Sequence, residues 1–337
     1  DLLRMSVSPP FTDRRRALPG DQPARRVVEA IFPRAKVSYV EHWPEIADLF
    51  DRLEDQRPAT CGAYAARYLL APLGFPTSEG ANTTREDYLA HLAGTVIEDS
   101  ELQEVREVKA RVEALGLSDA EAAERFPRTW YGWPLRSSDD DVVTGTSPTG
   151  TARAVAVGSG GALVTLPVPG RGRDGEVTMT PERFDSLLDL IEAHLGDWGV
   201  HPIANLEVDQ LLDATSDAYA PGSLAGADPE ASIPREHWGV GHFVGIGAFW
   251  RAGDGRRWVL LLDTYKARGF LGYVPMPAKS LRRAVVREDG RDGGLLLVMR
   301  RDTLEAARRA IEAFGLEIRM WGNGSLEPEG WAWSLGR

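Results

Sequence analysis

Two apolar runs joined by a polar turn restrict the fold of this chain more than any other feature. The first run covers residues 239–250, the second covers 258–262, and a turn rich in Gly and Arg lies between them. Strand-length apolar runs flanking a short turn are typical of a β-hairpin. If the turn centres near residues 253–254, His242 lies roughly opposite residues 263–265. We therefore expect His242 and Asp263 to lie side by side at one end of the hairpin.

The only cysteine, Cys61, lies at the predicted start of a helix. A lone cysteine cannot form an internal disulfide or head a cysteine metal cluster, so Cys61 is either an inert buried thiol or a nucleophile. Thr60 is predicted to cap the helix, whose dipole and free N–H groups would stabilise a thiolate in the first turn. A cysteine nucleophile needs a base oriented by a carboxylate, which His242 and Asp263 could supply.

The order Cys61, His242, Asp263, with Gln56 just before the cysteine, resembles that of the papain-like cysteine peptidases. The segments 56–70 and 239–265 are most similar to the bacteriocin-processing peptidases of that clan, which cut leader peptides from ribosomally made peptides. The resemblance implies a peptide or protein substrate and a thioacyl intermediate on Cys61. It also implies that His242 is the base, Asp263 orients it, and Gln56 stabilises the oxyanion together with the backbone N–H of Cys61. No cofactor and no metal are expected.

The distribution of the predicted elements indicates an α+β fold, because helices concentrate in the first half of the chain and strands in the second. The resemblance implies a papain-like version, with a helical N-terminal half packed on a mainly antiparallel C-terminal sheet. We expect a flexible basic arm over residues 1–26 and a single catalytic domain over 27–337, with a helical insertion over about 84–235. The predicted helices cover 84–124, a segment from Thr180, 206–215 and 302–315. The other predicted elements are a turn at 43–44, a polar mobile segment over 137–150, a hairpin over 153–168, a loop over 218–232, and strands over 272–277, 294–299 and 317–321.

Four further residues are candidates for binding substrate. Gly62 and Gly241 would let the backbone approach a peptide closely, and Trp130 and Trp133 belong to an aromatic loop. The stripe of apolar residues spaced by three or four along 102–115 indicates a helix face buried in the core. His237 is a rival for the role of base, because it lies close to His242 in the sequence.

Composition excludes some classes of function. A net charge of −11 over 337 residues argues against general nucleic-acid binding. No apolar run approaches the roughly 18 residues that a membrane span needs. Asp139–Asp141 lacks the spaced ligands of a calcium loop. The single unpaired cysteine fits a reducing cytoplasm, and the oligomeric state stays open.

Two other classes of function fit the same residues. In the first, an amine instead of water resolves the acyl-enzyme, as in transglutaminase-like or arylamine acetyltransferase-like proteins, which also have the order Cys, His, Asp. In the second, the chain is a non-catalytic peptide-binding relative in which Cys61 is a small buried apolar residue. Reactivity of the thiol separates the second class from the enzymes, and product analysis separates hydrolysis from transfer.

Overall fold

A seven-stranded antiparallel sheet forms the centre of the computed structural model, which describes residues 28, 32, 34–75, 85–211, 240–287 and 289–334. The strands follow the order β4-β9-β5-β6-β7-β8, and β1 pairs with the far half of β6. The strands are β1 (Val37–Tyr39), β4 (Leu163–Pro169), β5 (His201–Glu207), β6 (Gly241–Arg251), β7 (Arg257–Leu262), β8 (Tyr273–Pro277) and β9 (Gly294–Arg300). This mixture of helices and a mainly antiparallel sheet confirms the predicted α+β class.

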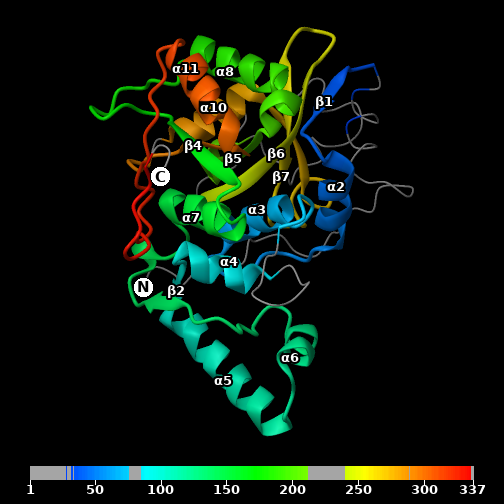
Figure 1. Ribbon diagram of the computed structural model, residues 1–337, viewed down its shortest axis with the longest axis vertical. Helices are drawn as coiled ribbons and strands as arrows, with labels where there is room; N and C mark the ends of the chain where they lie inside the picture. The colour runs from blue at the N-terminus through cyan, green and yellow to red at the C-terminus, as the bar shows by residue number, and fades with distance from the viewer. Residues whose placement is uncertain are drawn as a thin grey trace.

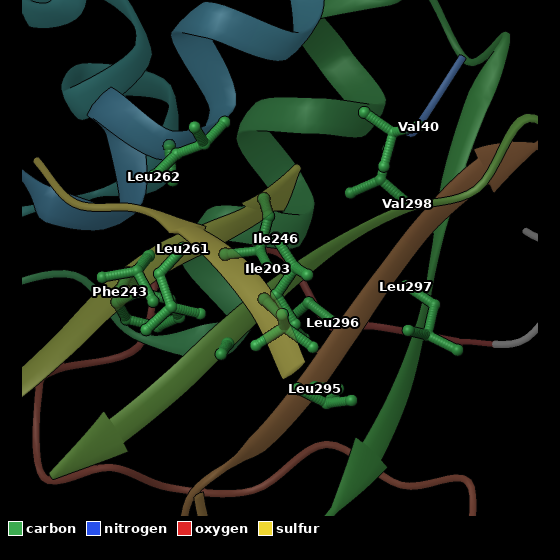
Figure 2. Packing of buried hydrophobic residues seen from close by; sticks show 14 of the residues in the cluster. Val40, Ile203, Phe243, Ile246, Leu261, Leu262, Leu295, Leu296, Leu297 and Val298 are labelled. Atoms are coloured by element: carbon green, nitrogen blue, oxygen red, sulfur yellow. The ribbon is translucent and has the colours of Figure 1, made fainter. Parts of the chain in front are cut away.

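Helices cover the sheet on both sides (Figure 1). One group consists of α3 (Cys61–Leu70), α4 (Glu86–Ala93) and α7 (Pro148–Gly158), with α2 (Trp43–Arg52) at its edge. The other group consists of α8 (Pro181–Ala193), α10 (Ala278–Val286) and α11 (Leu304–Glu312). Covered on both faces, the central strands are buried along nearly their whole length, which explains their continuous apolar runs. Figure 2 shows the packed side chains, among them Ile203, Phe243 and Leu296.

Glycines on β6 let the first group of helices approach the sheet closely. A Cβ placed on Gly245 would lie 2.1 Å from the Tyr68 hydroxyl of α3, and one on Gly247 would lie 2.3 Å from the ring of Trp43 in α2. Tyr68 is fully buried, so it has little room to move. The glycine spacing on β6 therefore sets the position of α3, and with it the position of Cys61.

We expect Gly245→Ala to destabilise the protein by about 1–3 kcal/mol, because the added methyl group overpacks the contact between α3 and β6. Urea unfolding followed by circular dichroism measures the change. Gly253→Ala is the matched control, because no atom lies within 4 Å of the Cβ position in that turn. Equal stability of the two variants would contradict the close packing of α3 on β6.

A second, smaller unit extends away from the sheet at the lower end of Figure 1. It contains β2 (Val96–Glu98), α5 (Asp99–Leu115), α6 (Asp119–Arg125) and β3 (Arg136–Ser138), with β2 and β3 paired in parallel. Its small apolar cluster consists of Val108, Val112, Ala122 and Trp130. The predicted apolar stripe on α5 is therefore only partly buried, and Leu115 at its end is 50% exposed.

Two predicted elements are wrong because tertiary pairing or local helix signals override the pattern. The hairpin over 153–168 is instead helix α7 followed by strand β4, and Ser147 caps this helix with Pro148 in its first turn. In the described part of the helix predicted over 206–215, which ends at residue 211, the structure has the end of β5 and a short 3₁₀ turn over Val208–Gln210. The register that places Leu206 opposite His242 keeps this segment in the sheet.

Other expectations also need correction. Where a turn is predicted at Trp43, helix α2 begins instead, because Pro44 suits the start of a helix. No strand forms over 317–321, which contacts β4 through a single backbone bond from Arg319. The polar segment 137–150 contains the end of β3 and the start of α7, and the insertion over 84–235 supplies β4 and β5 to the sheet. The basic arm, the loop over 218–232 and His237 lie outside the described residues.

Candidate functional site

The β6–β7 hairpin brings His242 and Asp263 together, as the sequence predicts. In the ladder of this hairpin Gly245 lies opposite Leu262. Nearer the turn, the pairing register shifts by one residue between Ile246 and Ala248. His242 lies near the start of β6, and Asp263 directly follows β7. The His242 Nε2 atom lies 3.2 Å from Asp263 Oδ1. The carboxylate therefore lies where it can orient the imidazole.

Helix α3 places Cys61 against this pair. Cys61 is the first residue of the helix, and its side chain hydrogen-bonds to that of His242. Because Nε2 of the imidazole faces Asp263, the other ring nitrogen, Nδ1, is the one available to the thiol. Cys61 is 8% exposed and His242 is 2% exposed. Three elements from distant parts of the chain thus form a thiol–imidazole–carboxylate series in a buried setting.

The charged forms of His242 and Asp263 stabilise each other. Burial opposes charge on His242, but Asp263 and then Cys61 outweigh it and raise the pKa of His242 from 6.5 to about 9. Burial also opposes charge on Asp263, but Arg268, His242 and the backbone N–H of Tyr265 lower the pKa of Asp263 from 3.8 to about 2. Near neutral pH the site therefore favours an imidazolium next to a carboxylate.

Arg268 is a residue of the site that sequence reasoning missed. Its Nη1 atom lies 2.5 Å from Asp263 Oδ2, and both side chains are fully buried. Asp263 Oδ1 also accepts a hydrogen bond from the backbone N–H of Tyr265 at 3.0 Å. A single arginine five residues after Asp263 carries no sequence signal that separates it from the many surface arginines.

Gln56 lies at the site, as the sequence suggests, and its partners come from the segment after Asp263. The backbone N–H of Gln56 donates to the carbonyl of Thr264 at 3.0 Å, and its side-chain Nε2 lies 3.1 Å from the Tyr265 hydroxyl. The Thr264 hydroxyl donates to Gln56 Oε1 and lies 3.0 Å from His242 Nε2. The ring of Tyr265 stacks on that of His242 with centroids 5.5 Å apart. Thr264 and Tyr265 were missed, although their position directly after Asp263 was a usable signal.

The loop that precedes Cys61 is held by α4. Glu86, which is buried, accepts hydrogen bonds from the backbone N–H of Arg57 at 2.8 Å and from the Thr60 hydroxyl. The Thr60 hydroxyl oxygen also lies 2.7 Å from the Arg57 carbonyl oxygen. Thr60 occupies the position before the helix, but its side chain caps no backbone N–H, so the predicted cap is wrong. Ala59 has a φ of 58°, a strained value that these contacts hold in place.

The two glycines predicted to bind substrate have other surroundings. A Cβ on Gly62 would lie 2.4 Å from the Thr151 hydroxyl and 2.9 Å from Thr146, so this glycine lets α3 pack against α7. Gly241 is exposed, and a Cβ there would lie 2.9 Å from the guanidinium of Arg287. The Cβ position of Gly62 faces the protein interior, so close packing of two helices already accounts for this glycine, and its contact with a substrate stays a prediction.

The two tryptophans of the aromatic loop also point elsewhere. Trp130 belongs to the small cluster of the projecting unit, and its Nε1 donates to Asp119 at 2.7 Å. Trp133 packs against aromatic rings of α4. Tyr131 is the member of this loop that reaches the segment before Cys61, because the Arg57 guanidinium lies 4.8 Å from the centre of its ring. The contacts described for Trp130 and Trp133 thus lie within the projecting unit and on α4, and their role in substrate binding stays a prediction.

The described residues contain no group of three or more His, Cys, Asp or Glu side chains that could hold a metal ion. Within the same residues, no helix has the length and apolar character needed to cross a membrane. The side chains that meet at the site are a thiol, an imidazole and a carboxylate, the groups that a cysteine nucleophile with an oriented base would use. This arrangement can move a proton from the thiol to the imidazole and hold the resulting ion pair.

Comparison with protein families gives one match. A family model described as a family of unknown function (DUF6885) matches residues 40–322. The matched range includes the candidate triad, the projecting unit and every strand of the central sheet except β1. Among curated proteins no match is found.

Proposed function

We propose that this chain, which belongs to the DUF6885 family, is a papain-like thiol hydrolase that cleaves a peptide bond through a thioacyl intermediate on Cys61. The observation that carries the proposal is the hydrogen-bonded series from Cys61 to His242 to Asp263, assembled from α3, β6 and the end of β7. A buried thiol without a chemical role would need neither an imidazole nor a buried carboxylate beside it.

In the proposed reaction, the Cys61 proton passes to His242 and the thiolate attacks the carbonyl carbon of the substrate. A bond forms from sulfur to carbon, and the carbonyl oxygen takes a negative charge. The backbone N–H of Cys61, at a helix start where N–H groups lack intrahelical partners, and the Gln56 amide stabilise that oxyanion. The C–N bond then breaks, His242 protonates the leaving amine, and water releases the acyl group from Cys61.

The substrate class follows from the same proposal. A peptide or protein is the expected substrate, with a leader or precursor peptide of a ribosomally made peptide as the specific candidate. We place the activity in the cytoplasm, because an unpaired reactive thiol persists in a reducing compartment. No role for nucleic acid is expected, because the chain carries a net charge of −11.

We expect iodoacetamide to alkylate Cys61 at pH 6 at least about tenfold faster than it alkylates glutathione, because the imidazolium of His242 stabilises the thiolate. Mass spectrometry over time measures the rate at a single site, since the chain has one cysteine. His242→Gln is the matched control and should react at about the rate of glutathione. Slow labelling of the wild-type protein would overturn the proposed nucleophile. Product analysis on peptides then separates hydrolysis from transfer to an amine.

A further inference from the structure

A line of polar side chains connects the candidate base to the candidate oxyanion donor. Thr264 is fully buried, and its hydroxyl lies between His242 Nε2, at 3.0 Å, and Gln56 Oε1. On the far side of the amide, Gln56 Nε2 lies 3.1 Å from the Tyr265 hydroxyl. The backbone bond from Gln56 to the carbonyl of Thr264 fixes the spacing between the two segments. The Thr264 hydroxyl thus contacts both His242 and Gln56.

The direction of every hydrogen bond in this line follows from Asp263. With the pKa of Asp263 near 2, its carboxylate is ionised at neutral pH and can only accept. His242 Nε2, which lies 3.2 Å from Asp263, must therefore carry the hydrogen. The Thr264 oxygen next to that N–H consequently accepts, and its own hydrogen points to Gln56 Oε1. The amide of Gln56 then presents its N–H groups toward Tyr265.

The opposite orientation of the Gln56 amide conflicts with this order. It would turn N–H groups toward the Thr264 oxygen, which already accepts from His242 Nε2, and would take the Gln56 Oε1 acceptor away from the hydrogen of the Thr264 hydroxyl. The side of the amide that carries the N–H groups faces the Tyr265 hydroxyl.

We propose that Thr264 is a positioning residue that couples the base to the oxyanion donor. Its hydroxyl, together with the Asp263 carboxylate, accepts the hydrogen of His242 Nε2, which leaves Nδ1 to exchange a proton with Cys61. The same hydroxyl holds Gln56 with its N–H groups directed toward the reacting carbonyl. This role rests on the proposed function of the site, and it extends that function to a residue that neither contacts the substrate nor transfers a proton to it.

Two probes separate the two parts of this role. Iodoacetamide alkylates Cys61 by displacing iodide from a saturated carbon, a reaction that forms no oxyanion. p-Nitrophenyl acetate acylates Cys61 through a tetrahedral oxyanion and releases p-nitrophenolate. We expect Thr264→Val, which keeps the shape and loses the hydroxyl, to slow acylation at least about tenfold more than alkylation. Thr264→Ser, which keeps the hydroxyl, should restore both rates to within about threefold of the wild type.

A purely structural role of Thr264 would slow both reactions by the same factor. Thr264→Ala is measured in parallel, so that the conclusion does not depend on the folding of the valine variant alone. The ¹⁵N spectrum of His242, recorded above pH 9 where the imidazole is neutral, gives a readout that is independent of rates, because loss of the Thr264 acceptor should raise the fraction of neutral imidazole with the hydrogen on Nδ1. An unchanged ratio of the two rates and an unchanged spectrum in the valine and alanine variants would overturn the proposal.

The wild-type rates distinguish failure of this proposal from failure of the proposed function. If wild-type Cys61 reacts with both probes no faster than glutathione, the proposal that Cys61 is the nucleophile is overturned. The proposed role of Thr264 is then overturned as well. If the wild type reacts fast and Thr264→Val behaves like the wild type, only the coupling role is overturned. Fast wild-type reactions with a selective loss of acylation in Thr264→Val support both.

Discussion

Replacing Asp263 with alanine should lower the free energy of unfolding by about 3–5 kcal/mol, a larger effect than expected for a residue that only orients a base. The side chains of Asp263 and Arg268 are both fully buried and lie 2.5 Å apart. Removing the carboxylate leaves the guanidinium of Arg268 in the interior without its carboxylate partner. Urea unfolding followed by circular dichroism measures the loss.

The matched control is the double variant Asp263→Ala with Arg268→Met, which removes both buried charges and keeps much of the volume. We expect it to recover most of the stability that Asp263→Ala loses, because replacing a whole buried pair by apolar groups is close to neutral. A loss of less than about 1 kcal/mol in Asp263→Ala would contradict the buried pair, since exposed pairs contribute that little.

The stability difference between the wild type and Asp263→Asn should also depend on pH in a defined direction. The pKa of Asp263 is lowered from 3.8 to about 2, so its contribution is fully present above about pH 4 and is lost as the pH falls through 2. The pKa of His242 is raised from 6.5 to about 9, so its contribution is present below about pH 6.5 and is lost as the pH rises through 9. The difference should therefore be largest between about pH 4 and 6.5.

Replacing His242 with alanine should reduce acylation of Cys61 by p-nitrophenyl acetate to the level of an ordinary thiol, and Cys61→Ala should abolish it. Loss of a nucleophile or its base in triads of this kind costs on the order of 10⁴-fold or more with good substrates. The measurement is the burst of p-nitrophenolate, whose amplitude should equal the protein concentration in the wild type alone.

The fold of these two variants provides the control. Alanine is small and suits the start of α3, so Cys61→Ala should unfold at nearly the same urea concentration as the wild type. A burst retained by pure Cys61→Ala would remove the proposed nucleophile. Fast alkylation retained by His242→Ala would instead leave Cys61 as the nucleophile and point to a different base.

Local patterns in the sequence are sufficient to predict the hairpin and part of the candidate site. Strand register follows from the length of two apolar runs and the turn between them, so the proximity of His242 and Asp263 could be predicted. The start of a helix at Cys61 and the α+β class could be predicted for the same reason. Gln56 was placed at the site on the strength of a resemblance, and its partners could not be foreseen.

Packing between distant segments decided the rest. The helix over Pro148–Gly158 and the strand at Leu206 were misassigned, because short apolar segments fit either structure until their neighbours are known. Gly62 was assigned to substrate, yet it faces Thr151 of α7, and only the position of that helix reveals this.

The register of a hairpin and the start of a helix are local properties, so the residues themselves dictate which chemical groups meet at one end of the hairpin. How those groups are held depends on the packing of segments that are distant in the chain. Arg268 and Asp263 are buried together and form an ion pair. Thr264 contacts both His242 and Gln56, because the segment after β7 lies against the segment before α3. Burial and hydrogen-bond direction depend on atoms from several elements at once, so no stretch of sequence carries them.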